Sequence, residues 1–222
     1  MNKTDIWDKY MWTKAKDIQF HKPYYEPIWK TTCIDDQINT DVLQSSFCRH
    51  SRRFFTSESV GKHTIDYIIN YARVDVERYP YLRLYMINQT KDQTQSGIYK
   101  LSNSGHMEKI NAAYRKKLIL ASLQGMWWYG SGLSFYLVVD LNNLFENSDT
   151  INCYTDMLIS LGVVAQSIIM AGYSKGLGGW MTPAINEDIA KQLLGINSHT
   201  HEALYFVKLG HPDSRDSGNK QI

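Results

Sequence analysis

Cysteine is scarce in this sequence. Its 222 residues include only Cys33, Cys48 and Cys153, which are widely spaced and form no CxxC pair. An odd number of scattered cysteines argues against a disulfide framework and against a zinc site, and it is typical of a reducing compartment. We therefore expect a cytoplasmic protein that binds no metal.

Long apolar runs are also missing. The most apolar stretch, Leu158 to Ala171, contains Gly162, Gln166 and Ser167. Because of these interruptions we expect it to be too short and too polar to span a bilayer. The N-terminus, MNKTDIWDKYMW, lacks the apolar core of a signal peptide. The sequence therefore predicts no membrane partner.

Neither sign of charge predominates. The 24 basic and 22 acidic residues give a net charge of +2, so charge alone favours neither nucleic acid nor an anionic membrane as a partner. Aromatic residues, by contrast, make up 13% of the chain. This abundance suits either a ring-rich core and dimer interface or a pocket that stacks a flat ligand.

Helical and strand patterns mix along the chain without regular βαβ repeats, which predicts an α+β fold. Apolar residues at helical spacing predict helices near 60–72, 109–124, 154–174 and 186–194. Asn186 is expected to cap the last of these helices and Gly195 to end it. Strand-forming runs lie at 82–87, 97–101, 134–139 and 203–209, and 146–153 is expected to be a loop. We divide the chain into an N-terminal arm (1–40), one domain (41–212) and a C-terminal tail (213–222).

A basic cluster, Arg49-His50-Ser51-Arg52-Arg53, is the first candidate site. Arg49, Ser51 and Arg53 alternate, so in an extended segment their side chains could point the same way. Two guanidinium groups and a hydroxyl suit a phosphate, because arginine makes bidentate, charge-assisted hydrogen bonds. A solvated basic surface is the alternative.

Glycines at 176, 178 and 179 follow the long helix and form the second candidate. They allow either a close approach of the backbone to a ligand or simply a helix end and a turn. The pattern is not GxGxxG and follows a helix, which argues against a Rossmann site. No GxSxG nucleophile motif is present.

Three segments in this order resemble the FMN-dependent nitroreductase superfamily. Arg49 to Phe54 is similar to the family's R-x-S-x-R/K-x-F. Residues 161–194 resemble its long helix, "GLG" exit and following helix that ends in "LLG". Residues 202–212 resemble its closing strand and "GxP". Within the superfamily the chain is most similar to the SagB/McbC-type peptide azoline dehydrogenases. The further matches are an aromatic arm at 6–34, Ser96-Gly97-Ile98-Tyr99 and Gln124-Gly125-Met126-Trp127.

This resemblance implies a nitroreductase-like fold, with a central mixed or antiparallel sheet flanked by helices. It also implies an obligate homodimer with FMN at the subunit interface, in which the flavin supplies the redox chemistry. The residues carried over to the phosphate and ribityl end of FMN are Arg49, His50, Ser51 and Arg53, with Arg215 as a second phosphate contact. Those carried over to the isoalloxazine ring are Met181, Thr182, Pro183 and Ala184.

Three positions depart from the family pattern. The small, polar turn that contacts the flavin is replaced by the acidic segment Val74 to Arg78. The Lys-Tyr pair of the azoline dehydrogenases is missing before the long helix, where Asp149 or Tyr154 could transfer the proton instead. Pro183 lacks a backbone donor, so Ala184 would have to supply one to the flavin.

Three functions remain open on this basis. The first is FMN-dependent oxidation of a peptide-derived natural product, such as azoline-to-azole or Cα–Cβ oxidation. The second is NAD(P)H-dependent reduction of nitro compounds or quinones. The third is a non-catalytic, nitroreductase-like subunit of a biosynthetic complex.

Overall fold

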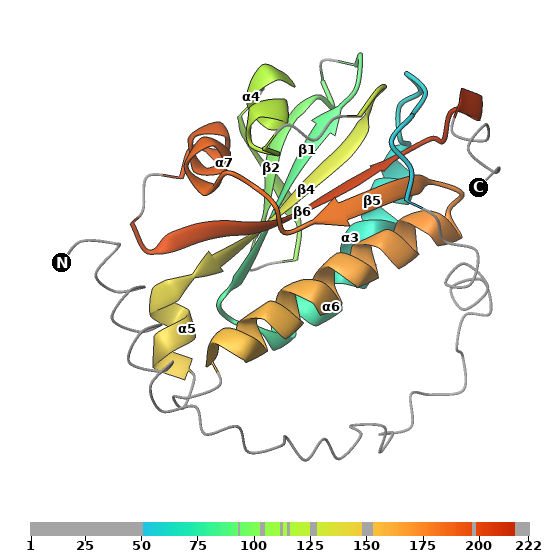
Figure 1. Cartoon of the computed structure of the whole chain (residues 1–222). Coiled ribbons are helices and arrows are strands. Elements are labelled where there is room, and N and C mark those ends of the chain that lie inside the picture. Colours follow the sequence, from blue (N-terminus) through green and yellow to red (C-terminus); the bar gives the residue numbers. More distant parts are fainter. Residues whose placement is uncertain are drawn as a thin grey trace, which may run out of the picture. The chain divides into compact units, whose positions relative to one another are not determined.

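The computed structural model describes residues 51–215 except 93, 103–104, 112, 115, 125–127, 148–152 and 197–198. Its centre is a six-stranded sheet in the order β3-β2-β1-β4-β6-β5, and helices cover both faces (Figure 1). The helices are α3 (Lys62–Arg78), α4 (Lys116–Ala121), α5 (Leu141–Asn147), α6 (Cys153–Ser174) and α7 (Glu187–Leu194). The strands are β1 (Leu82–Gln89), β2 (Gly97–Leu101), β3 (Met107–Asn111), β4 (Gly132–Asp140), β5 (Gly178–Thr182) and β6 (His201–Gly210).

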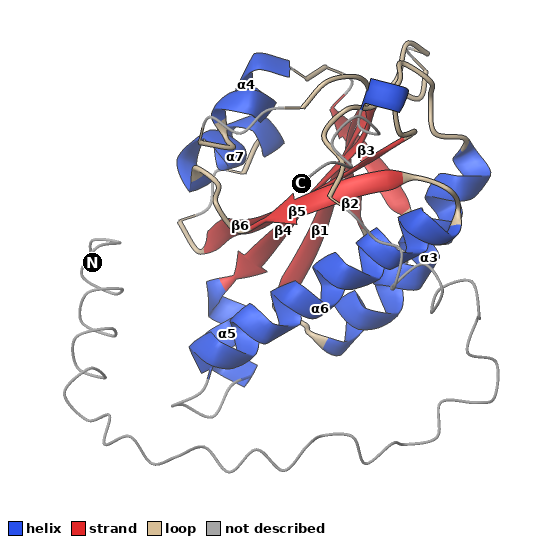
Figure 2. Ribbon diagram, turned by 45° about the vertical axis from the view of Figure 1, so that its right-hand side comes forward, coloured by secondary structure: helices blue, strands red, loops and turns tan. Residues whose placement is uncertain are grey.

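The sheet is antiparallel throughout. All five strand pairings run antiparallel, and among the described residues parallel pairing is confined to isolated bridges of the segment before α3. Helices α3 and α6 lie on one face, and α4 and α7 lie on the other (Figure 2). The predicted α+β class is confirmed, and of the two sheet types that were expected the structure has the antiparallel one.

The central strands form the core because both of their faces are covered. Every residue of β4 is buried, and β4 pairs with β1 on one side and with β6 on the other. Burial on both faces explains why Phe135 to Val139 is a continuous apolar run rather than an alternating one. The strand predicted at 134–139 is confirmed.

Helix α6 is apolar on nearly all sides. It has 22 residues, and by length and hydropathy it could cross a membrane, although 56% of the relevant window is buried inside the protein. The interruptions at Gly162, Gln166 and Ser167 therefore do not make it too polar, contrary to the expectation from sequence. A helix with this composition is typical of a position between other elements. Part of its surface is nevertheless exposed, at Leu158, Ile159 and Val163.

Helix α7 begins and ends as its sequence predicts. The Asn186 side chain accepts a hydrogen bond from the Ile189 backbone N–H at 3.1 Å, which satisfies one free donor of the first turn. Gly195 follows the helix with a φ of 70°, in the left-handed region that glycine adopts without strain.

Three local expectations were wrong. Residues 109–111 belong to strand β3 rather than to a helix, because hairpin pairing with β2 takes precedence over local helical spacing. Helix α5 covers the start of the predicted loop, and Asp140 caps it by accepting from the Asn143 N–H at 3.3 Å. The helix end expected at the first glycine is confirmed, because Gly176 has a φ of 74° in the turn after α6, and Gly178 and Gly179 lie in strand β5. Val74 to Arg78 is the last part of α3 and not a turn.

Candidate functional site

Residues 51–55 lie against the edge strand β5. Ser51 forms a parallel bridge with Gly179, and the Arg52 N–H donates to the Gly179 carbonyl at 2.9 Å. A Cβ atom on Gly179 would lie 2.3 Å from the Lys208 carbonyl oxygen, and one on Gly178 would lie 2.9 Å from the Arg52 Cγ. The glycines of β5 therefore allow the chain to approach itself closely.

The same segment is held on its other side by two loops. The Phe55 N–H donates to the Tyr129 carbonyl at 3.0 Å, and the Tyr129 N–H donates to the Arg53 carbonyl at 2.9 Å. The Asp213 N–H donates to the Phe54 carbonyl at 3.0 Å. Three regions far apart in sequence are thus joined through backbone hydrogen bonds, and the predicted residues Ser51, Arg53 and Arg215 belong to them.

Arg53 and Trp180 form the most favourable place for an anion. The Arg53 guanidinium lies 5.2 Å from the centroid of the Trp180 ring, within the range of a cation–π contact. The Trp180 side chain is 3% exposed, and its Nε1 has no hydrogen-bond partner among the described residues. A guanidinium beside a buried N–H without an acceptor suits a phosphate oxygen.

Arg215 is already paired within the chain. Its Nη2 donates to Asp213 Oδ2 at 2.7 Å, and its guanidinium lies 5.4 Å from the Phe54 ring centroid and 5.7 Å from that of Tyr129. The hydrogen bonds from Arg215 lower the pKa of Asp213 to about 2. Asp213 therefore stays ionised at neutral pH, so the charge of Arg215 is compensated before any ligand arrives.

The residues carried over to the flavin ring form a fixed turn after β5. Thr182 is buried, whereas Pro183 is exposed and Met181 and Ala184 are half-buried. The Ala184 N–H donates to Thr182 Oγ1 at 3.0 Å. This donor, which the family resemblance assigned to the flavin, is therefore used inside the turn, and Met181 and Pro183 offer apolar contact only.

Tyr154 is not brought to this region within one chain. It lies in the first turn of α6, and Ser174, the last residue of that helix, precedes the turn into β5. The separation of 20 positions along the helix corresponds to about 30 Å at 1.5 Å per residue. Arg49, His50 and Asp149 lie outside the described residues.

Lys208 is a buried charged residue that the sequence analysis missed. It pairs with Trp180 across β5 and β6 and is fully buried. Its Nζ donates to Gln89 Oε1 and lies 3.4 Å from Ser134 Oγ. Burial, and then repulsion from Lys116, lower the pKa of Lys208 well below its ordinary value. The signal was available, because Lys208 is the only charged residue in the apolar run ALYFVKLG.

Lys208 is expected to make the stability of the protein depend on pH. Between its lowered pKa and the ordinary value of 10.5, the unfolded chain holds a proton that the folded chain has released. The free energy of unfolding therefore rises with pH through this window, by at most about 1.4 kcal/mol per pH unit. Urea unfolding of the wild type and of Lys208→Met from pH 6 to 10 measures the effect.

The Lys208→Met variant should lose that slope and gain most in stability at the low end of the range. Lys116→Met serves as the control, because removing its charge should raise the pKa of Lys208 and move the slope to higher pH. A Lys208→Met variant that kept the wild-type slope would contradict the assignment.

Comparison with known proteins gives matches at the level of structure only. No protein-family model matches the sequence, and no curated protein matches it either. A protein from Ralstonia eutropha assigned as a nitroreductase is 17% identical, covers 78% of this chain and 83% of its own, and gives a TM-score of 0.62.

Two further matches have more specific descriptions. The NADPH:FMN oxidoreductase from Vibrio harveyi, solved with NAD+, is 16% identical over 78% of this chain and 69% of its own, with a TM-score of 0.56. The microcin synthetase McbBCD complex from E. coli, with truncated pro-MccB17 bound, contributes a chain that is 12% identical. That match covers 90% of this chain and 81% of the other, with a TM-score of 0.59.

Proposed function

Since this chain has the nitroreductase fold, we propose that it is an FMN-dependent oxidoreductase acting on a peptide-derived natural product. The proposed reactions are azoline-to-azole oxidation and Cα–Cβ oxidation. The observation that carries this choice is the extent of the matches. The E. coli microcin synthetase chain covers 90% of this chain, whereas the two nitroreductase-type proteins cover 78%.

The phosphate end of FMN fits the region around β5. Arg53 would donate to the phosphate oxygens while its stacking on Trp180 keeps the guanidinium in place. The indole N–H of Trp180 would gain the acceptor that it lacks, and the exposed Ser51 hydroxyl would bind beside it. Arg215 would join as a second phosphate contact if it exchanged Asp213 for the ligand.

The ring end would be held mainly by apolar contact. Met181 and Pro183 would lie along the isoalloxazine, and the Thr182–Ala184 hydrogen bond keeps their turn rigid. The bound flavin would accept or donate the hydride, which no side chain here can do. Asp149 and Tyr154 remain our candidates for proton transfer, and Tyr154 would reach a flavin only from the other subunit of a dimer.

A homodimer is supported by exposed apolar side chains on the α3 and α6 surface. Ile159 is 55% exposed and Val163 is 37% exposed, while Val74 on α3 is 51% exposed. A Cβ atom on Gly162 would meet nothing within 4 Å, so another helix could approach closely there. Apolar surface of this kind on neighbouring helices is typical of an interface.

A second candidate function is NAD(P)H-dependent reduction of nitro compounds or quinones. The match to the NADPH:FMN oxidoreductase of Vibrio harveyi favours it. The third, a non-catalytic subunit of a biosynthetic complex, is favoured by the occupied Ala184 donor at the ring end. These candidates differ in what reduces the flavin and in whether flavin binds at all.

The test is the absorbance spectrum of the full chain after incubation with FMN and removal of the excess. We expect flavin bands with about one FMN per chain, and anaerobic bleaching by a thiazoline-containing peptide but not by NADPH alone. If NADPH alone bleached the flavin, the protein would be the NAD(P)H-dependent reductase of the second candidate function. A protein that takes up no FMN would be the non-catalytic subunit.

A further inference from the structure

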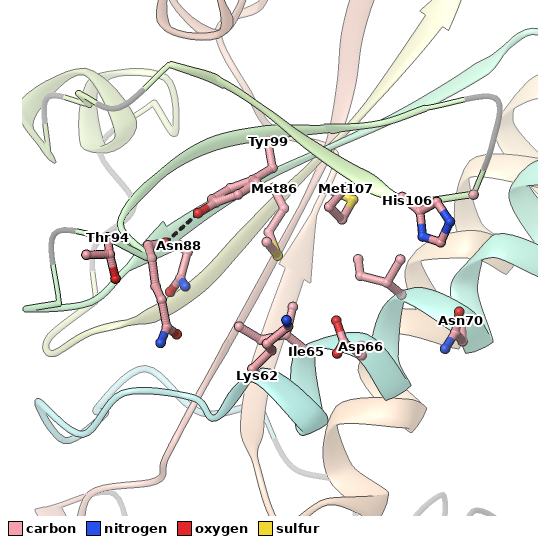
Figure 3. Close-up of a pocket in the computed structure, with 13 residues that line it drawn as sticks. Lys62, Ile65, Asp66, Asn70, Met86, Asn88, Thr94, Tyr99, His106 and Met107 are labelled. Carbon is pink, nitrogen blue, oxygen red and sulfur yellow. Dashed lines mark hydrogen bonds between the residues drawn. The ribbon is translucent and has the colours of Figure 1, made fainter.

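A cavity of about 760 Å³ lies between α3, β1 and the β2–β3 hairpin (Figure 3). Its volume is in the range of small-molecule sites, and none of the described residues assigned to FMN above lines it. Helix α3 contributes Lys62, Ile65 and Asp66, and the hairpin contributes Tyr99 and Met107.

The most informative residue of the cavity is Asn88 on β1. Its side chain lines the cavity and the residue is only 3% exposed. No hydrogen bond joins its carboxamide to another described residue, and its oxygen and nitrogen are not among the fully buried polar atoms that lack a partner. The amide is therefore accessible from the cavity, where water or a ligand can pair with it.

Beside this amide, the lining of the cavity is mostly apolar on one side. Ile65, Ile69, Met86 and Met107 line it, and methionine adapts to side chains of varied shape. This apolar lining suits one aliphatic side chain of a ligand. The carboxamide of Asn88 can both donate and accept, which matches the backbone amide beside that side chain.

The charges at the mouth argue against an anionic ligand. Lys62 and Asp66 both line the cavity, stand one helical turn apart on α3, and make no ion pair among the described residues. A phosphate would gain from Lys62 and lose to Asp66. Opposite charges on one rim suit a ligand with no net charge, such as a peptide backbone.

The cavity lies at the same end of the sheet as the proposed flavin site. Residues 56–61 join the segment at 51–55 to the start of α3. Within this link, Ser59 Oγ is 2.5 Å from Thr90 Oγ1, just after Asn88 and the end of β1. The neighbouring Gln89 side chain accepts from Lys208 on the opposite face. Because Asn88 is in register with Leu133, Leu209 and Gly179, the cavity and the Trp180 ring that Arg53 contacts lie on opposite faces of this end of the sheet.

We propose that this cavity binds a segment of the peptide substrate, with an aliphatic side chain on Met86 and Met107 and its amide at Asn88. The proposal rests on the proposed function for the class of substrate. It adds a recognition site separate from the flavin-binding residues. Asn88 would be a substrate-binding residue that recognises the peptide backbone away from the reacting atoms, and Met86 and Met107 would select the side chain.

Methyl NMR tests the proposal. The full chain, with its eight methionines labelled at the ε-carbon, is titrated with N-acetyl-leucine-N-methylamide, and Met86→Leu and Met107→Leu identify the two signals. We expect both signals to shift and saturate. N-acetyl-glycine-N-methylamide, which lacks the side chain, should bind at least 10-fold more weakly.

The decisive variant is Asn88→Leu. It should weaken binding of the leucine probe at least 10-fold and leave the Tm of the ligand-free protein close to that of the wild type, because the amide makes no hydrogen bond to another described residue. A purely structural asparagine would lower the Tm and leave the affinity of the folded protein unchanged. Asn142→Leu, an exposed position on α5, is the matched control and should leave the affinity unchanged.

The outcomes separate this proposal from the flavin function. If FMN binds and turns over while no peptide probe shifts Met86 or Met107, the cavity proposal is wrong and the function stands. If the methyl signals respond in a protein that takes up no FMN, the cavity proposal stands and the flavin function is wrong. Saturation of the same two signals by FMN or by inorganic phosphate would also overturn the peptide assignment.

Discussion

Replacing Arg53 with methionine is expected to lower the affinity of the chain for FMN by about 10- to 100-fold. Hydrogen bonds to a charged group contribute about 1.5–3 kcal/mol, and Arg53 is the described guanidinium that lies on Trp180 at the proposed phosphate end. Methionine keeps an unbranched apolar stem against the indole, so packing changes little. Quenching of FMN fluorescence on titration with the protein measures the affinity.

Arg52→Met is the matched control for this prediction. Arg52 is the neighbouring residue and is also half-buried. However, its stem packs against Gly178, and no cation–π contact is formed by its guanidinium among the described residues. Both variants remove one positive charge, so a general electrostatic effect would weaken binding equally. If both variants lost the same FMN affinity, or if Arg53→Met lost none, the assignment of Arg53 to the phosphate site would be wrong.

The sequence predicted the elements whose pattern is strong and local. Helix α6 and strand β4 are long, apolar and buried, so composition alone located them. Helix α7 has its own cap and stop signals at Asn186 and Gly195. Strand β3 was missed because MEKIN is mostly exposed and becomes a strand only by pairing with β2.

For the candidate site, the sequence indicated residue types but not their hydrogen-bond partners within the chain. The spacing of Ser51 and Arg53 indicated a phosphate site, and the structure places both beside β5. Nothing in the sequence showed that Arg215 would pair with Asp213 or that the Ala184 N–H would donate to Thr182. Such contacts depend on side-chain geometry, which residue patterns do not specify.

The double variant Ile159→Glu/Val163→Glu is expected to convert a homodimer into a monomer. Both side chains are exposed on α6, and on one helix residues four apart lie on the same face. Two carboxylates buried in an interface without partners would cost several kcal/mol, which raises the dimer dissociation constant by more than about 100-fold. Light scattering during size-exclusion chromatography measures the mass directly.

Ile110→Glu on β3 is the control, because Ile110 is 45% exposed but lies on the opposite part of the domain, at the sheet edge. It should leave the mass unchanged. A wild-type chain that is already monomeric would contradict the proposed interface. If the double variant is monomeric and also loses FMN, the flavin site requires both subunits. That result would be expected if Tyr154, about 30 Å of helix away from β5 in its own chain, acts across the dimer.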